Sequence, residues 1–264
     1  MRTKHKDRKR NPLKNRKKRK ALMSRILGEA EGFLGIGPFA NDLKRINGAK
    51  SVIQRIRDCQ SKRINGKLKY CSHQHYCDVC NYIRRNNIGE ALEAYRVFTE
   101  TEKRKGRLYF YVRDECFEFP DGIDWERVDK VTLPFLLKRK KRLRDSLERG
   151  ISRFKGNLSR IEIAYRNGIP MIRLRSMWFT DKTEMHSMSV FWQPYTEYEE
   201  NHYARVKYAG TAYTRTAIKC ILERYYGSNV YKGCKTSPED IAGFLKTFYN
   251  KATFTTGGDI FKRN

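Results

Sequence analysis

Four cysteines constrain this chain more than any other feature. Two residues separate Cys77 from Cys80, five separate Cys71 from Cys77, and eleven separate Cys59 from Cys71. A C-x2-C pair supplies two thiolate ligands from a single tight turn, and zinc takes four such ligands in a tetrahedron. The sequence therefore predicts a structural Zn²⁺ site formed by Cys59, Cys71, Cys77 and Cys80.

Two alternatives to this assignment remain open. His73 or His75 would replace Cys59 as a ligand, or one or two of the cysteines would be buried free thiols. The chain has seven cysteines, an odd number, and its charged N-terminus shows no secretory signal, so we expect a cytoplasmic protein without disulfides. The remaining cysteines have no partner at metal spacing and are expected to be core thiols: Cys116, Cys220 and Cys234.

The net charge is +28, from 57 Lys and Arg against 29 Asp and Glu in 264 residues. A chain with this charge repels itself unless a polyanion screens it, which makes nucleic acid the expected partner. Residues 1–20 carry a net +11, so residues 21–264 still carry +17, and the excess also belongs to a folded surface. The sequence has no apolar stretch of about 18 residues and no long helix with a single basic face, so we expect no membrane partner.

The hydrophobic pattern divides the chain into a disordered basic arm (1–20), a helical and zinc-knuckle region (21–105) and an α+β region (106–264). We expect an antiparallel sheet with flanking helices, because strands and helices do not alternate regularly. The expected helices lie at 21–58 with a loop at 32–38, 81–105, 133–154, 216–226 and 238–249. The expected strands lie at 108–112, 161–165, 171–179, 187–192 and 204–208. Asn167–Gly168 predicts a turn between the second and third strands, in a loop that Pro170 lengthens.

Three stretches resemble one protein family in their order and spacing. They are residues 70–85 (YCSHQHYCDVCNYIRR), residues 156–178 with the segment SRIEIAYRNGIPMIRLRSMW, and residues 244–262 (FLKTFYNKATFTTGGDIFK). Together they are similar to the rolling-circle replication initiator (Rep) proteins of small plasmids, which belong to the His-hydrophobic-His endonuclease superfamily. The resemblance implies a Rep endonuclease-like α+β fold over roughly residues 55–264.

The resemblance also implies a chemistry. In the family, a tyrosine hydroxyl attacks a DNA phosphodiester and leaves a 5′-phosphotyrosine and a free 3′-OH. Two histidines at positions i and i+2 of one strand hold the Mg²⁺ or Mn²⁺ that polarises the scissile phosphate. Here Met171 and Arg173 stand at those positions, and neither side chain binds a hard divalent ion. Arg173 and Arg175 share a strand face, so we expect them to bind phosphate directly.

The tyrosine that acts as nucleophile in the family is also replaced here. Cys220 stands at the aligned position. The catalytic candidates are the tyrosines around it: Tyr208, Tyr213, Tyr225 and Tyr226. A site of Glu162, Glu184 and His186 would hold Mg²⁺ or Mn²⁺ if nicking is retained. In the competing interpretation Glu162 pairs with an arginine.

Two functions compete. The first is a plasmid or phage replication initiator-like protein that binds origin DNA, with nicking retained or lost. The second is a non-catalytic, zinc-stabilised nucleic-acid-binding protein for copy control or RNA binding. An unrelated enzyme or a ribosome-associated protein would also account for the charge. In the first two cases the expected nucleic-acid contacts are Arg84, Arg85, Lys138, Arg139, Lys140, Lys141, Arg142, Arg173 and Arg175.

Overall fold

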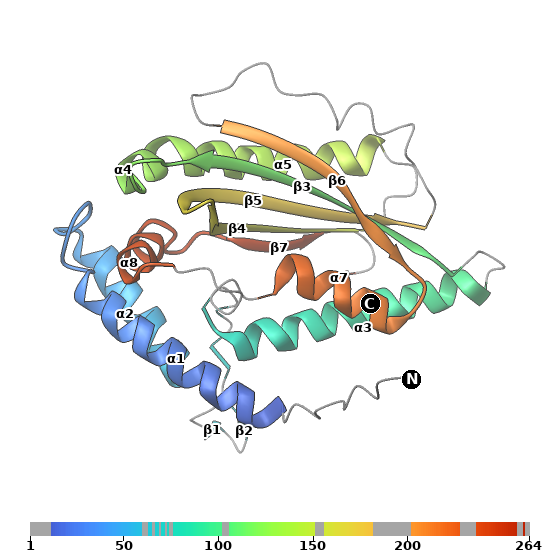
Figure 1. Cartoon of the computed structure of the whole chain (residues 1–264), viewed down its shortest axis with the longest axis horizontal. Helices are drawn as coiled ribbons and strands as arrows, with labels where there is room; N and C mark the ends of the chain where they lie inside the picture. Colours follow the sequence, from blue (N-terminus) through green and yellow to red (C-terminus); the bar gives the residue numbers. More distant parts are fainter. Residues whose placement is uncertain are drawn as a thin grey trace, which may run out of the picture.

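The structure, a computed structural model, describes residues 12–59, 63–64, 67–68, 70–71, 73, 76–101, 106–150, 156–181, 202–227, 236–257 and 261. Within these residues the fold is α+β, as the sequence predicts, with a five-stranded antiparallel sheet and helices on both of its faces (Figure 1). None of the described helices is long and apolar enough to span a membrane.

The sheet holds its strands in the order β6-β3-β5-β4-β7, and every neighbouring pair is antiparallel. These strands are β3 (Leu108–Glu118), β4 (Gly156–Arg166), β5 (Ile169–Thr180), β6 (His202–Ala212) and β7 (Phe254–Gly257). Because β3 and β4 both run antiparallel to β5, they run parallel to each other and need a crossover connection. The connection consists of α4 (Trp125–Arg127), the π-helix η1 (Val128–Thr132) and α5 (Leu133–Gly150).

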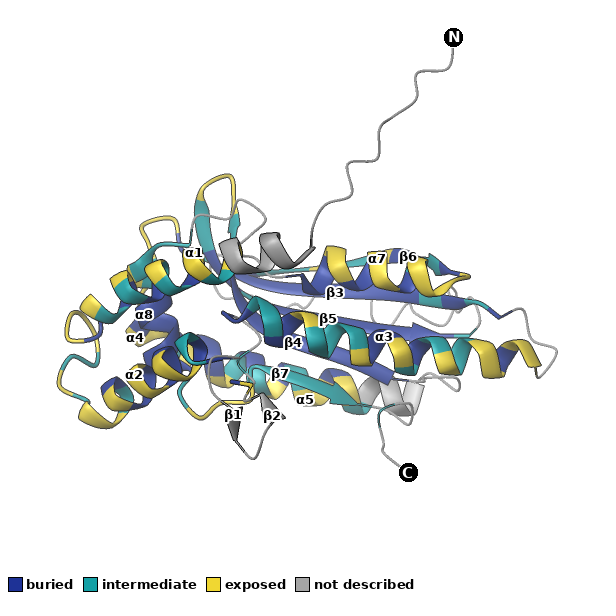
Figure 2. Ribbon diagram, turned by 90° about the horizontal axis from the view of Figure 1, so that it is seen from below, coloured by how far each residue is buried: buried dark blue, intermediate teal, exposed yellow. Residues whose placement is uncertain are grey.

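Different helices pack on the two faces of the sheet. On the first face, which we call the α5 face, Leu143 of α5 is buried with Tyr111 and Trp178. On the opposite face, which we call the α7 face, Leu222 is buried with Phe110 of β3 in a second core. The helices there are α3 (Asp78–Thr101) and α7 (Arg215–Tyr226). Figure 2 shows the strands buried between these layers, while the exposed residues of α3 and α7 face outward.

The hairpin between β4 and β5 has a two-residue turn. Asn167 and Gly168 both have positive φ, 52° and 86°, and Arg166 pairs with Ile169. This is the geometry that an Asn-Gly pair favours between antiparallel strands. The prediction that Pro170 lengthens the loop is wrong, since Pro170 lies inside β5. It is tolerated there because the pairing of β5 with β3 begins only at Met171.

Three further helices pack together at one end of the sheet (Figure 1). They are α1 (Pro12–Gly32), α2 (Leu43–Arg57) and α8 (Pro238–Thr247). Leu27, Ile53 and Phe244 meet in one core, so a single core joins the N-terminal helices to the C-terminal part of the chain. Gly243 of α8 lies against Trp125, where an added Cβ would be 2.1 Å from the indole ring.

Several elements are longer than the sequence predicts, among them α1 and β3. Helix α1 begins at Pro12, so residues 12–20 of the arm that was expected to be disordered are helical, while residues 1–11 lie outside the described residues. Proline is favoured in the first turn of a helix, and Lys and Arg are good helix formers. Strand β3 continues to Glu118 instead of ending at residue 112, because its charged second half is paired across the sheet. The strand predicted at 187–192 lies outside the described residues.

Candidate metal centre and basic sheet face

The four cysteines that the sequence singles out come together. All four are buried, and their sulfur atoms lie within 4.8 Å of one another. The Sγ–Sγ distances are 3.4 Å from Cys71 to Cys80, 3.6 Å from Cys77 to Cys59 and 3.7 Å from Cys59 to Cys80. In a tetrahedron with metal–sulfur bonds of about 2.3 Å, neighbouring sulfurs are about 3.8 Å apart. The group therefore fits a four-coordinate metal ion.

Local structure explains how these sulfurs converge. Cys59 follows the end of α2, and Cys80 lies in the first turn of α3, where the partial positive charge of the helix terminus favours a thiolate. The loop between is closed by two hydrogen bonds, from the His73 N–H to Cys71 Sγ (3.4 Å) and from the Cys77 N–H to the His73 carbonyl (2.9 Å). His73 supplies no ligand atom to the group, and His75 lies outside the described residues.

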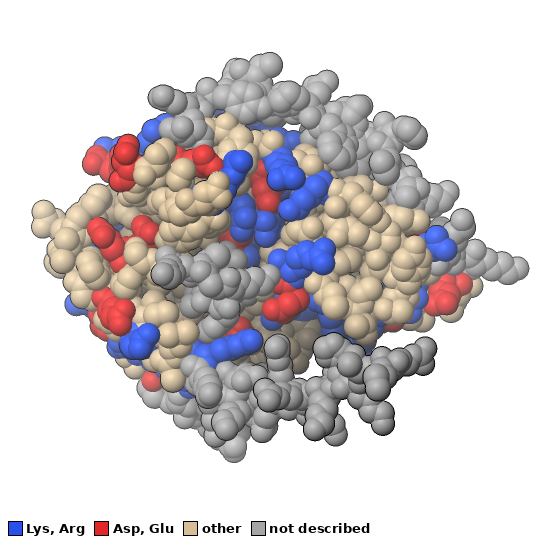
Figure 3. Space-filling model, in the orientation of Figure 1, with Lys and Arg blue, Asp and Glu red and all other residues tan. Residues whose placement is uncertain are grey.

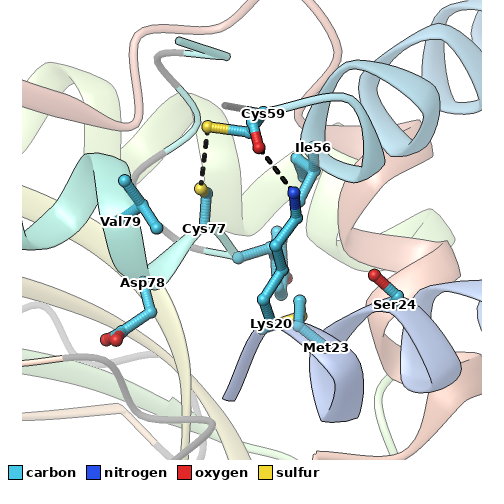
Figure 4. A pocket seen from close by; sticks show the side chains of 9 residues that line it. Lys20, Met23, Ser24, Ile56, Cys59, Cys77, Asp78 and Val79 are labelled. Carbon is cyan, nitrogen blue, oxygen red and sulfur yellow. Dashed lines mark hydrogen bonds between the residues drawn. The ribbon is translucent and has the colours of Figure 1, made fainter. Parts of the chain in front are cut away.

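Helix α1 contacts this centre through Lys20 (Figure 4). The Lys20 ammonium donates a hydrogen bond of 2.7 Å to the carbonyl oxygen of Cys59, and the Cys77 thiol points at the Cys59 sulfur. Hydrogen bonds from the thiols of Cys71, Cys77 and Cys80 hold the pKa of Cys59 well below its ordinary value. A thiolate is therefore favoured at Cys59, and the Lys20 charge lies beside the negative group that four thiolates and one divalent ion would form.

The other cysteines have different environments. Cys116 is buried in the sheet, and burial raises the pKa of its thiol to about 11, as suits a core thiol. Cys220 is exposed on α7, so the prediction that it belongs to the core is wrong. Its position on the outer side of an amphipathic helix explains the difference, since the buried stripe of α7 is formed by its neighbours Ile218, Ile221 and Leu222. Cys234 lies outside the described residues.

A second cluster lies on the α7 face of the sheet. Beyond the last turn of α7, the side chains on this face change from apolar to charged. They form what we call the basic sheet face: Asp114, Arg160, Glu162, Arg173, Arg175, Arg205 and Lys207. Figure 3 shows Lys and Arg side chains gathered near the middle of this view, between two areas with few charges.

The strand register brings the cluster together. Asp114 of β3 lies opposite Arg175 of β5 and Arg205 of β6. On the other side of β5, Arg160 of β4 pairs with Arg175, and Glu162 pairs with Arg173. Residues directly opposite one another on antiparallel strands point to the same face, as do residues two positions apart in one strand, so these side chains share one face. Five cations and two carboxylates leave three positive charges in excess.

Two ion pairs fix the central guanidinium groups. Arg175 donates hydrogen bonds of 2.6 Å and 2.7 Å to the two carboxylate oxygens of Asp114. Glu162 accepts a hydrogen bond of 3.1 Å from Arg173 Nε and also pairs with Arg160. The structure confirms the simpler interpretation of Glu162, which is pairing with arginine. Burial would raise the pKa of Glu162, but the charges of Arg160 and the neighbouring arginines outweigh it and lower that pKa to about 2.

The same arginines bind the C-terminal end of α7. Arg175 donates to the carbonyl oxygen of Tyr225 (3.1 Å) and Arg160 to that of Tyr226 (3.2 Å). The last carbonyls of a helix have no partner within the helix, and they carry the negative end of its dipole. Arg160 and Arg175, which are both buried, therefore hold α7 in position.

The four candidate tyrosines do not form one site. Tyr226 is buried and its hydroxyl donates 2.7 Å to the Leu158 carbonyl, while burial raises its pKa well above the ordinary value. Tyr208 packs on Tyr111, on the α5 face, and Tyr213 lies beneath the Arg107 guanidinium. The Tyr225 ring lies at the basic sheet face, and the Tyr226 ring lies against the same face, 5.3 Å from the guanidinium carbon of Arg160.

Tyr225 is buried there between two cations. The Arg175 guanidinium carbon is 5.5 Å and the Lys207 ammonium 5.1 Å from the centre of its ring. Both distances suit cation–π attraction, so the Tyr225 ring also helps to hold these charges in place.

The other predicted basic residues have separate locations. Helix α5 lies on the opposite face of the sheet from Arg173 and Arg175, so helix 133–154 and strand 171–175 do not form one continuous DNA surface. Arg139 is buried and donates to Glu115 at 3.0 Å, and Lys140 donates to the Ala252 carbonyl at 2.6 Å. Of the predicted cations of this helix, Lys138, Lys141 and Arg142 are exposed.

On α3, two predicted contacts lie near the edge of the basic sheet face. The Arg84 guanidinium lies 4.3 Å from the centre of the Phe254 ring, next to the position where β7 pairs with Arg160. Arg85 forms an ion pair with Glu223 of α7. Both side chains are partly buried, and they lie at the edge of the basic sheet face.

Apart from the four cysteines, the described residues contain no group of three His, Cys, Asp or Glu side chains placed to hold a metal. Glu184 and His186 lie outside the described residues, so the alternative site with Glu162 is not described. At the positions that the resemblance assigns to metal ligands, Met171 is buried and Arg173 is paired with Glu162. The described part of this face therefore offers guanidinium groups where the family has a hard metal ion.

Comparisons with known proteins identified no relative of this chain. No protein-family model matches the chain, and neither the curated proteins nor the solved structures contain a match. The likeness to replication initiators therefore depends on the residues and spacings of this chain alone.

The sequence pattern points to Arg173 and Arg175 but not to four other members of the basic sheet face. These are Asp114, Arg160, Arg205 and Lys207. A signal for them exists in the alternation of charge within predicted strands, since Arg205 and Lys207 are two residues apart, as are Arg160 and Glu162. Only the register of four strands shows that these pairs meet.

Proposed function

We propose that this chain is a zinc-stabilised nucleic-acid-binding protein of replication-initiator type. In this proposal the basic sheet face binds phosphates of origin DNA, and it does so without cutting the strand. The observation that carries the proposal is the meeting of five cations from β4, β5 and β6, with only two carboxylates among them. Such an excess on one face is what a polyanion requires.

The arrangement of the face supports phosphate binding in two ways. Guanidinium groups form charge-assisted, often bidentate hydrogen bonds with phosphate oxygens. Asp114 and Glu162 fix the directions of Arg175 and Arg173, so these groups need little reorganisation when an anion arrives. The exposed Arg205 and the partly buried Lys207 extend the charge toward the edge strand.

The position of α7 supports the initiator-type assignment. The resemblance implies that the helix carrying the nucleophile lies beside the strand carrying the metal. Here α7 lies beside β5, and Arg175 contacts the Tyr225 carbonyl at 3.1 Å. An arginine can hold a phosphate but has no lone pair with which to bind Mg²⁺ or Mn²⁺. We therefore propose that binding is retained at this face and that metal-dependent nicking is not.

Zinc is the metal that we propose for the cysteine group. Four thiolates at tetrahedral spacing form a closed site that suits zinc, and no position is left for a substrate. Bound there, the ion would link the end of α2, the start of α3 and the loop that carries Cys71. Structural zinc contributes directly to folding free energy, and this centre joins segments that carry many like charges.

The test is a salt titration of binding to a short duplex DNA. For B-DNA, log K falls by about 0.9 per phosphate contact for each log unit of salt. Replacing Arg205 and Lys207 together with Gln should reduce that slope by about 1.8. The matched control replaces Lys141 and Arg142 with Gln, which removes the same charge from exposed positions of α5. An equal reduction in both variants would show that net charge matters and the face does not.

A second assay addresses nicking. Supercoiled plasmid carrying the cognate origin is incubated with the protein and Mn²⁺, and in parallel with EDTA. The proposal expects no relaxed circles and no covalent 5′-phosphotyrosyl adduct in either case. Metal-dependent nicking, or an adduct on Tyr225, would overturn the non-cutting part of the proposal. Tighter binding to RNA than to DNA of the same sequence would instead favour the RNA-binding function.

A further inference from the structure

A cavity of about 260 Å³ lies between α2, α8 and the segment that follows α8, beside the loop of the metal centre. One water molecule needs on the order of 10–15 Å³ of such space, so the cavity accommodates a much larger group. None of the residues of the basic sheet face lines it. The cavity is therefore a separate feature of the described structure.

Aromatic rings form much of its wall. Tyr76 and Phe244 meet edge to face with their ring centres 5.7 Å apart, and Phe244 stacks on Phe248 at 4.2 Å. Val52 and Leu245 add aliphatic surface. Walls of this kind favour a flat, apolar-faced group over a hydrated ion, because ring faces stack and do not coordinate.

The rest of the lining is polar and includes Arg55, His73, Asn250, Lys251 and Thr253. The Nε2 atom of His73 is buried at the cavity and has no hydrogen-bond partner among the described residues. A buried ring nitrogen of this kind costs free energy unless a ligand or water pairs with it. Arg55 and Lys251 also line the cavity, and both are exposed, so they lie where it meets solvent. The ligand that fits is a flat ring with hydrogen-bonding edges and an attached anion.

The cavity is connected to the basic sheet face through the backbone. Thr253 lines the cavity, and its carbonyl accepts a hydrogen bond of 2.8 Å from the N–H of Ile161. The next residue, Phe254, pairs with Arg160, which belongs to the basic sheet face. The wall of the cavity therefore adjoins the strand pair that carries Arg160.

We propose that this cavity binds one unstacked base of a single strand, with the adjoining phosphate on Arg55 and Lys251. The proposal rests on the proposed function, because it assumes that the strand is nucleic acid. Base recognition in single strands commonly combines aromatic contacts with hydrogen bonds to the base edge. His73 would supply the edge contact, and the rings of Tyr76 and Phe248 the apolar surface.

The test measures binding of a deoxynucleoside 5′-monophosphate to the full chain by calorimetry, with inorganic phosphate and the matching nucleoside as comparisons. The mononucleotide should bind at least tenfold more tightly than inorganic phosphate. Val52→Phe, which fills the cavity, should abolish this preference. The double variant Arg55→Gln with Lys251→Gln should weaken nucleotide binding severalfold and leave nucleoside binding unchanged. Because those two side chains are exposed, this variant keeps the test valid if Val52→Phe fails to fold.

Three results would overturn the inference. They are equal affinity for nucleotide and phosphate, nucleotide binding that survives both variants, and failure of a single-stranded oligonucleotide to displace the mononucleotide. Lys141→Gln serves as the control and should leave mononucleotide binding unchanged, because Lys141 is exposed on α5 and belongs neither to the cavity nor to the basic sheet face. Failure of the proposed function is visible separately, as a duplex-binding slope that Arg205→Gln with Lys207→Gln does not change.

Discussion

Replacing Glu162 with Gln tests whether the basic sheet face is held together by charge. The side chain of Glu162 is 4% exposed and pairs with Arg160 and Arg173. Its pKa falls from an ordinary 4.5 to about 2 in the folded protein. At about 1.4 kcal/mol per pKa unit, that difference corresponds to about 3 kcal/mol of unfolding free energy at neutral pH. The substitution also leaves the buried Arg160 without its carboxylate partner, which acts in the same direction.

The sign of the pH dependence follows from the depressed pKa of Glu162. Its contribution to stability is complete above pH 4.5, where the carboxyl is ionised in both the folded and unfolded states. The contribution is lost as the pH falls toward 2, because the folded protein must then take up a proton. The difference in stability between the wild type and Glu162→Gln should therefore be largest near pH 7 and should shrink toward pH 3.

The assay is urea unfolding of both proteins at several pH values, followed by far-UV circular dichroism. Comparing the two proteins at each pH removes effects that they share, such as protonation of the cysteine thiolates. Glu90→Gln is the matched control, because Glu90 forms an exposed pair with Arg215 and such pairs contribute at most about 1 kcal/mol. A difference that stays constant with pH, or one no larger than that of Glu90→Gln, would refute the electrostatic explanation.

Four other outcomes are expected. The purified chain should contain one zinc per molecule by atomic emission; Cys80→Ser should lose it, whereas Cys220→Ser should retain it. Removing zinc with a strong chelator should lower the melting temperature of the wild type but leave that of Cys80→Ser almost unchanged. Gly243→Ala should destabilise the protein by about 1–3 kcal/mol in urea unfolding, since its Cβ would overlap the rigid Trp125 ring, although Ala favours helix by about 1 kcal/mol. Gly35→Ala, which meets nothing within 4 Å, should change stability little. Glu162→Gln should steepen the salt dependence of duplex binding, because it removes a negative charge from the basic sheet face.

The parts of the structure that the sequence predicts correctly depend on local spacing. The cysteine group follows from the C-x2-C pair, and the turn at Asn167–Gly168 follows from residues that adopt positive φ easily. The start of α8 follows from Ser237, whose side chain accepts the Asp240 N–H at 2.9 Å. In each case a few neighbouring residues contain the whole signal.

The parts that could not be predicted depend on pairing between distant strands. Arg205 and Arg160 are 45 positions apart in the sequence and reach one face only through the order β6-β3-β5-β4. Periodicity also gives no indication that α5 would lie on the opposite side of the sheet from Arg173. The charged second half of β3 resembled a loop because its pairing partners, among them Arg175 for Asp114, come from another strand.

The carboxylates that hold Arg173 and Arg175 have a consequence for selectivity. A free arginine side chain loses on the order of 2 kcal/mol of rotamer entropy when it is immobilised, and here much of that loss has already occurred on folding. Side chains two residues apart on a strand are separated by about 6.8 Å along it, a distance that the backbone sets. If this face binds phosphates as proposed, polyanions with a different spacing between their negative groups would bind less well than their total charge suggests. Affinity would then depend on the spacing of the negative groups as well as on their number.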